Sequence, residues 1–299
     1  MEYVIETHEV SKKYKTRYAV NKVSIRVKKG AIYGLIGRNG AGKTSLIKML
    51  VGLSSKDEGT IKLFGEEDNL KMRSRIGCSI ENPCLYPKMS AYENLEYYRK
   101  LFGIVDKDIV DKTLQIIGLD NVGNKKTRNF SLGMKQRLAL GIALIGNPDV
   151  LILDEPLNGL DPTGIRELRE LFLKLNREKG VTIIISSHIL GELSRVATDY
   201  GVIDKGTLVE QFSKEELEHR CRRCIKIKSF DTTKVCAILE TKLKTKEYDV
   251  LQDGTVRLFE YIEEPEKVNR VLFEHGASIQ SFGAVSEDLE DYFMQLMNQ

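Results

Sequence analysis

Residues 37–44, Gly-Arg-Asn-Gly-Ala-Gly-Lys-Thr, combine small residues with one lysine and one hydroxyl. Such a loop lets backbone N–H groups curl around phosphates, and a helix that follows it directs its positive N-terminal end at the same charge. In this pattern the Lys43 ammonium binds the β and γ phosphates and the Thr44 hydroxyl ligates Mg²⁺. We therefore predict an ATP and Mg²⁺ site formed by Gly37, Arg38, Asn39, Gly40, Ala41, Gly42, Lys43, Thr44 and Ser45.

Two acidic residues, Asp154 and Glu155, follow the apolar residues 150–153. Ligands of open α/β sheets bind at the carboxyl ends of the strands. We expect Asp154 to orient Mg²⁺ through water and Glu155 to polarise the attacking water as a general base. Strands that end in two acidic residues are common, so this interpretation depends on the phosphate loop upstream.

The first half of the chain shows the elements that must position these residues. Residues 4–10 and 23–27 alternate between apolar and polar side chains, which predicts half-exposed antiparallel strands. Residues 31–36 are continuously apolar, as in a strand covered on both faces, and a helix is expected over about 43–51.

Later segments complete an α/β fold. Apolar residues recur at helical spacing from about 90 to 144, which predicts an inserted helical subdomain, taken as about 84–146. Strands return at 150–153 and 181–185, with a helix around 165–177 between them. Strands linked by a crossover helix pair in parallel, so the core is a doubly wound sheet of the P-loop NTPase class.

The composition changes after residue 212, and the elements then read strand, helix, hairpin, helix, strand. Asp253-Gly254 is a hairpin turn signal. This order would suit a ferredoxin-like α+β module, followed by a final helix that begins at Ser286. We therefore divide the chain into an ATP-binding domain, 1–212, and a C-terminal accessory module, 213–299.

Between the phosphate loop and the paired carboxylates lies the segment 130–137, Phe-Ser-Leu-Gly-Met-Lys-Gln-Arg. It resembles the signature segment of ABC transporter ATPases. In that family this serine and glycine bind the γ phosphate held by a second copy of the domain, so the resemblance implies that Ser131 and Gly133 act in a homodimer. Leu132 and Met134 replace a glycine and a glutamine that are usual in the segment.

The resemblance covers about residues 1–212 and implies roles for three further residues. Asp161 belongs to a loop like the one that contacts the second protomer. His188 matches the histidine that reaches the γ phosphate and helps to hold the attacking water. Tyr14 falls where the family has an aromatic residue that stacks on adenine.

Glu81 departs from the family, which usually has a glutamine here that touches Mg²⁺ and the membrane subunit. Two carboxylates about 4 Å apart repel by about 4 kcal/mol at an effective dielectric constant of about 20, so Glu81 needs compensation near Glu155. We expect Glu81 to ligate Mg²⁺ when nucleotide is bound. The same exchange occurs in lantibiotic-immunity transporters, and residues 33–40 with the signature segment resemble the bacitracin-resistance group.

Composition limits the classes of partner. The chain has 299 residues, 41% hydrophobic and 30% charged, with a net charge of +3 that gives no electrostatic case for a nucleic-acid partner. No apolar run approaches the roughly 18 residues that span a bilayer, and no secretion signal is evident. The expected location is cytoplasmic, attached to the inner face of the membrane through a separate transmembrane permease subunit.

Five cysteines fit reduced thiols, and Cys221 and Cys224 are interpreted as unconnected despite their spacing.

Three functions stay open. The leading one is an ATPase subunit that powers export of, or immunity to, a peptide antibiotic. The others are a general exporter subunit and an ABC ATPase that acts on ribosomes or nucleic acid, although the single motif set and the lack of a heptad run argue against the latter. A partner that binds ATP but scarcely hydrolyses it is disfavoured by Glu155 and His188.

Overall fold

A computed structural model describes residues 2–81, 85–285, 292, 293 and 296. The chain divides into two compact units, Met1–Lys214 and Glu215–Gln299, which are treated separately below. The helix expected from Ser286 onward lies mostly outside the described residues. No helix in the described part of the chain is long and apolar enough to cross a membrane.

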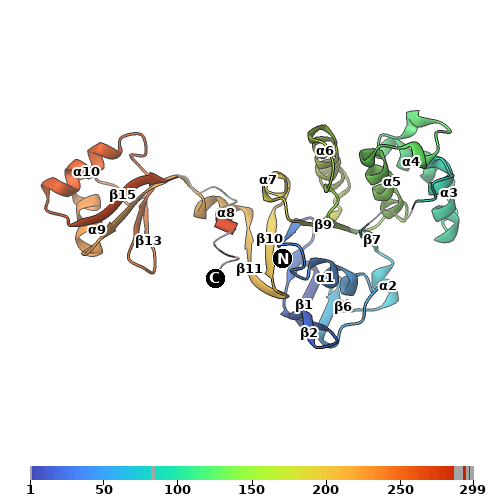
Figure 1. The fold of residues 1–299 in the computed structure, drawn as a ribbon, viewed down its shortest axis with the longest axis horizontal. Helices are drawn as coiled ribbons and strands as arrows, with labels where there is room; N and C mark the ends of the chain where they lie inside the picture. The colour runs from blue at the N-terminus through green and yellow to red at the C-terminus, as the bar shows by residue number, and fades with distance from the viewer. Residues whose placement is uncertain (1, 82–84, 286–291, 294–295, 297–299) are drawn as a thin grey trace. The chain divides into compact units, whose positions relative to one another are not determined.

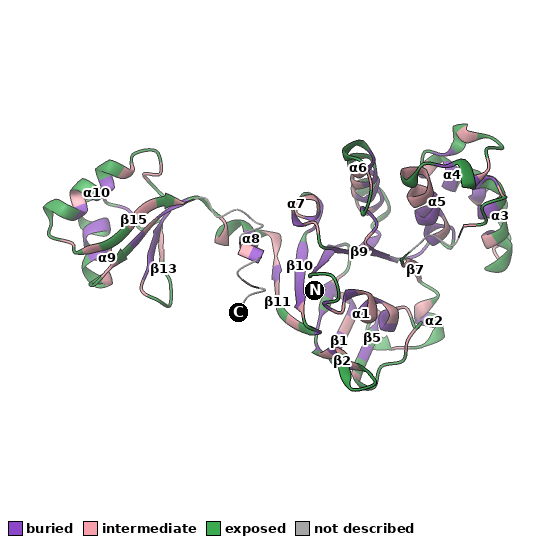
Figure 2. Cartoon of the chain, in the orientation of Figure 1, coloured by how far each residue is buried: buried purple, intermediate pink, exposed green. Residues whose placement is uncertain are grey.

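A six-stranded sheet forms the centre of the first unit (Figure 1). Its order is β11 (Thr207–Ser213), β10 (Asp199–Asp204), β4 (Ile32–Ile36), β9 (Thr182–Ser187), β8 (Val150–Asp154) and β7 (Ile76–Ser79). All neighbours pair in parallel except β10 with β11. Strands β4, β8 and β9 are buried along their whole length, as their continuous apolar sequences predict (Figure 2).

A second, antiparallel sheet of five strands lies in the same unit. Its strands are β1 (Tyr3–Tyr14), β2 (Arg17–Val23), β3 (Arg26–Lys28), β5 (Glu58–Leu63) and β6 (Glu66–Glu67). The single strand expected over 23–27 is wrong, because the chain breaks between β2 and β3. The Thr7 hydroxyl causes the break by donating to the carbonyl of Val23 and accepting from the amide of Ile25, in place of ladder bonds.

Helix α1 (Lys43–Leu50) follows β4 and packs its apolar side chains into the core between the two sheets. Leu46, Ile47, Met49 and Leu50 are buried there with residues of β1, β2 and β8. Helix α6 (Pro162–Lys179) makes the crossover between β8 and β9, and the short helix α7 (Leu190–Leu193) follows β9. The crossover fixes β8 and β9 as parallel neighbours.

Three helices form the inserted segment: α3 (Ala91–Leu101), α4 (Ile109–Ile116) and α5 (Leu132–Leu144). They follow the short helix α2 (Leu70–Arg73) and β7, and α5 contacts β7. Helix α3 begins with a capping box, in which the Ser90 hydroxyl accepts from the Glu93 amide and the Glu93 carboxylate accepts from the Ser90 amide. These caps give α3 a defined start.

The second unit contains an antiparallel sheet in the order β13 (Tyr248–Val250), β14 (Val256–Leu258), β12 (Cys224–Ser229) and β15 (Ile279–Val285). Helices α9 (Thr232–Thr241) and α10 (Pro265–Glu274) connect its strands, and their apolar side chains share one core with β12 and β14. Helix α8 (Lys214–Arg220) precedes β12. The element order β-α-β-β-α-β is that of a split βαβ module.

Gly77 in β7 lies against the backbone of α5. A Cβ at Gly77 would lie 2.0 Å from the carbonyl oxygen of Ala143, so we expect Gly77→Ala to lower the free energy of unfolding of the first unit by about 1–3 kcal/mol. Gly146→Ala is the matched control, because a Cβ there meets nothing within 4 Å. Urea unfolding followed by circular dichroism measures both, and equal stability of the two variants would contradict this account of the contact.

Candidate functional site

The phosphate loop runs from the carboxyl end of β4 to the first turn of α1. Gly42 precedes the helix with φ 111°, in a region that side chains rarely adopt, and a Cβ there would lie 2.3 Å from the carbonyl oxygen of Ala19. Glycine is therefore required at this position by both conformation and space. A hollow at the loop is lined by Ala19, Asn39, Gly40, Ala41, Gly42, Lys43, Thr44, Ser45 and Glu155.

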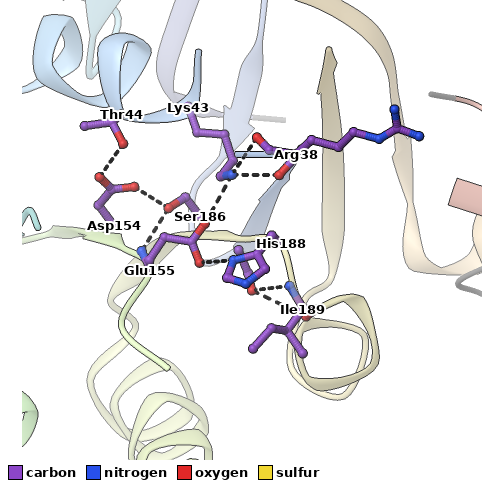
Figure 3. Close-up of polar contacts among 10 residues, drawn as sticks. Arg38, Lys43, Thr44, Asp154, Glu155, Ser186, His188 and Ile189 are labelled. Atoms are coloured by element: carbon purple, nitrogen blue, oxygen red, sulfur yellow. Dashed lines mark hydrogen bonds and ion pairs between the residues drawn. The ribbon is translucent and has the colours of Figure 1, made fainter. Parts of the chain in front are cut away.

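Lys43 is held across the loop and is 5% exposed. Its ammonium donates to the carbonyl of Gly37 at 2.6 Å and to the carbonyl of Arg38 at 3.3 Å, and lies 3.1 Å from Oε1 of Glu155 (Figure 3). A buried charge is costly unless it is paired and hydrogen-bonded, and these contacts supply such partners. The phosphate loop therefore holds a cation at the N-terminus of α1, where an anion would bind.

Thr44 and Asp154 meet across the gap between α1 and β8. The Thr44 hydroxyl donates to Oδ2 of Asp154 at 2.7 Å, and Asp154 is 6% exposed. Hydroxyl and carboxylate oxygens are the donors that Mg²⁺ prefers, usually with phosphate oxygens and water completing its octahedron. Among the described residues no three His, Cys, Asp or Glu gather to hold a metal.

Glu155 lies at the junction of the loop and the sheet with φ 50°, and it directs its two oxygens at different partners. Oε2 lies 2.8 Å from Nδ1 of His188, which follows β9 directly. Oε1 is buried and accepts no hydrogen bond within the described part of the chain, although the Lys43 ammonium is near it. Such a carboxylate oxygen can accept a proton from a water molecule once the ammonium beside it is drawn to another anion.

Tyr14 lies at the end of β1 beside a second hollow, which it lines with Arg17, Tyr18, Ala19, Gly40, Lys205 and Gly206. Its ring is half exposed, and the Lys12 ammonium lies 5.7 Å from the ring centroid. Ala19 and Gly40 line both hollows, so the aromatic surface adjoins the phosphate loop. An exposed ring at this place can stack on a planar base.

Glu81 follows the end of β7 with φ 57° and forms an ion pair with Lys48 of α1 at 2.7 Å. The hydrogen bond to Glu81 raises the pKa of Lys48, so this ammonium stays charged. The positive charge that Glu81 was expected to need is therefore supplied by Lys48 of α1. Within the described part of the chain, no hydrogen bond or ion pair joins Glu81 to Asp154 or Glu155.

Ser131 and Asp161 are the N-cap residues of α5 and α6. The Ser131 hydroxyl accepts from the Met134 amide, and a carboxylate oxygen of Asp161 accepts from the Gly164 amide. Gly133 lies in the first turn of α5, where a Cβ would be 3.7 Å from Leu160. No hydrogen bond of the described residues joins Ser131 to the phosphate loop of its own chain.

Ser186, which lies beside both carboxylates, was not among the site residues predicted from the sequence. Its hydroxyl donates to Oδ1 of Asp154 and accepts from the Glu155 amide (Figure 3). Lys205 and Gly206, which line the hollow beside Tyr14, were not predicted either. A polar residue at the end of an otherwise apolar strand was the signal available for Ser186, whereas nothing in the local sequence marks the other two.

Comparison with known proteins identifies this arrangement. The pattern of the family described as "ABC transporter" matches residues 20–158. A bacitracin transport ATP-binding protein of Enterococcus faecalis is 42% identical over 99% of this chain and 97% of its own length. This chain belongs to the ABC transporter ATP-binding proteins.

Further comparisons bear on the extent of this ABC ATPase. A lantibiotic transport ATP-binding protein of Streptococcus pyogenes is 42% identical, over 72% of this chain and 94% of its own length. The solved structure of an ATP-binding subunit of an ABC transporter matches with a TM-score of 0.64 and 26% identity, over 73% of this chain and 92% of that chain. The family prediction is confirmed, so the chain binds and hydrolyses ATP as the ATPase subunit of an ABC transporter. A solved ATP-binding cassette described as dimeric and bound to ADP and phosphate has the same fold, with a TM-score of 0.63 and 23% identity over 70% of this chain.

The contacts of Glu155 predict the effect of removing its charge. We expect Glu155→Gln to lower the ATP turnover number by about 10²–10⁴-fold, because an amide cannot accept the proton of the attacking water. ATP binding should persist, since the loop and Lys43 are untouched, and the variant should accumulate as an ATP-bound dimer.

Single-turnover hydrolysis and size-exclusion chromatography with ATP measure these two effects. Glu178→Gln, exposed on α6, is the charge-matched control. Hydrolysis by Glu155→Gln at the rate of the unmodified protein would remove Glu155 from the role of base.

Proposed function

We propose that this ABC ATPase powers a separate membrane permease that exports a peptide antibiotic and so protects the cell, with bacitracin-type peptides as the first candidate. The observation that carries the proposal is the similarity to a bacitracin transport protein across both units of the chain, over 99% of its length. The lantibiotic transport protein matches over 72% of the chain, a share similar in length to the first unit alone. The presence of a second unit therefore favours the bacitracin type over the lantibiotic type.

Hydrolysis in this proposal depends on the groups around Glu155. When ATP binds, its phosphates offer the Lys43 ammonium a stronger anionic partner than Glu155, which frees Oε1 to accept a proton from water. The oxygen of that water bonds to the γ phosphorus while the bond to the β,γ-bridging oxygen breaks, which yields ADP and phosphate. His188, bonded to Oε2, keeps the Glu155 carboxylate directed at the water.

Mg²⁺ is the proposed cofactor, and the Thr44 hydroxyl and Asp154 are the residues that would hold it, with Glu81 as a further ligand in the bound state. When bound, Mg²⁺ neutralises charge on the β and γ phosphates. Arg38, Asn39 and the glycines of the loop supply the surrounding backbone, and Tyr14 supplies the surface for adenine.

A second copy of the chain completes the proposed site. Ser131 and Gly133 of that copy would bind the γ phosphate through the N-terminus of α5, and Asp161 would lie in the contact between the copies. The exposed position of Ser131 at a helix start, without a bond to its own phosphate loop, supports this assignment. Attachment to the inner face of the membrane then comes through the permease.

The substrate is tested in cells. Co-expression of the chain with a candidate membrane permease should raise the minimum inhibitory concentration of bacitracin several-fold in a sensitive host. Glu155→Gln with the same permease is the control that keeps the complex and removes turnover. Protection against a lantibiotic but not against bacitracin would reverse the order of the two candidates, and protection against neither would contradict the antibiotic assignment.

Glu81 is expected to act in coupling. Glu81→Gln should keep most of the ATPase activity of the purified chain, because the amide oxygen can still approach a metal, but should weaken resistance because the charge paired with Lys48 is lost. Purified ATPase rates and resistance in cells that carry the permease measure the two effects. Glu66→Gln, exposed on β6, is the control, and unchanged resistance with Glu81→Gln would contradict the coupling role.

A further inference from the structure

Ser186 is the last residue but one of β9 and is the direct neighbour of the carboxylate pair. In the parallel pairing of β8 with β9, its Cα is the partner of the Cα of Asp154. The residue is fully buried and follows the apolar residues Ile183, Ile184 and Ile185. A hydroxyl buried in such surroundings is costly unless it is hydrogen-bonded, so its bonds show what it does.

The hydroxyl of Ser186 makes one bond to each of the two acidic residues. It donates its proton to Oδ1 of Asp154 and accepts the amide proton of Glu155 at 2.9 Å (Figure 3). Because Thr44 donates to Oδ2, both oxygens of Asp154 are held, one from α1 and one from β9. Rotation of the Asp154 carboxylate would break one of these bonds.

The bond to the Glu155 amide acts on a residue with an unusual backbone. Glu155 has φ 50°, in the left-handed region that residues other than glycine rarely adopt. Its amide is held by both the hydroxyl and the carbonyl oxygen of Ser186, the latter at 3.2 Å. This backbone conformation sends the Glu155 side chain toward Lys43 and His188.

We propose that Ser186 is a positioning residue whose single hydroxyl sets the direction of Asp154 and of Glu155 together. Loss of the hydroxyl frees one oxygen of Asp154 and one of the two restraints on the strained backbone of Glu155. The proposal rests on the roles proposed above for Asp154 and Glu155. It adds that both roles depend on one group in β9, the Ser186 hydroxyl, which donates to Asp154 and accepts from Glu155.

The test compares Ser186→Ala with Thr182→Val at the other end of β9. Thr182 is also buried, and its hydroxyl accepts from the Gly30 amide, so its loss removes a similar bond far from the carboxylates. Replacement of residues that orient metal ligands commonly costs about 10–100-fold in activity or metal affinity, and we expect a loss of turnover number in this range for Ser186→Ala. The KM for ATP should change little, since the loop and Lys43 stay in place.

A second readout does not depend on hydrolysis. The Mg²⁺ concentration that half-saturates binding of a fluorescent ATP analogue should rise several-fold in Ser186→Ala and stay unchanged in Thr182→Val. Ser186→Thr, which keeps the hydroxyl, should recover both the turnover number and the Mg²⁺ dependence. Urea unfolding shows that the compared variants are folded.

The outcomes separate this proposal from the roles on which it rests. An unchanged turnover number and Mg²⁺ dependence in Ser186→Ala, with Glu155→Gln inactive, would overturn the positioning role alone. Equal losses in Ser186→Ala and Thr182→Val would also overturn it, because stability would then explain both. Full activity of Glu155→Gln would instead remove the base role, while a raised Mg²⁺ requirement in Ser186→Ala would still support positioning of Asp154.

Discussion

The parallel register of β4, β9 and β8 is the constraint on which the site depends. These strands end at one edge of the sheet, so the loop after β4, the histidine after β9 and the acidic pair at the end of β8 converge there. A slip of one residue would reverse the faces of a whole strand and would separate Ser186 from Asp154. Because the side chains of these strands are buried on both faces, a slip would also disrupt their close packing.

At this edge of the sheet, two carboxylates are each paired with an ammonium group. Lys43 faces Glu155, and Lys48 faces Glu81, so α1 supplies one ammonium for the carboxylate that follows β8 and one for the carboxylate that follows β7. Lys43 is almost completely buried, whereas Lys48 and Glu81 are in contact with solvent. The buried pair of Lys43 and Glu155 is therefore little screened by salt, and it responds mainly to a new anion. The exposed pair of Lys48 and Glu81 is weak, so either residue can readily take another partner.

Much of this arrangement could be predicted from the sequence because it depends on local signals. The glycines of the phosphate loop, the apolar run before Asp154 and the turn at Asp253-Gly254 each have a local physical meaning, and they indicated the fold class. The family was indicated by the resemblance of residues 130–137 to the signature segment. The strand expected over 23–27 failed, since the Thr7 side chain that interrupts it lies 16 residues before Val23. The ion pair of Glu81 and the hydrogen bonds of Ser186 could not be predicted from the sequence either. They depend on which helix lies next to Glu81 and which strand lies next to Ser186 in the fold.

The close approach of Gly77 to the carbonyl of Ala143 has a mechanical consequence. Helix α5 begins next to Ser131 and approaches β7 closely near its other end through backbone atoms, so a displacement of the helix would be transmitted to the strand that leads to Glu81. Backbone contacts do not depend on which side chains decorate the helix. The coupling between the start of α5 and β7 would therefore survive changes of side chain along the helix, provided that residue 77 stays glycine.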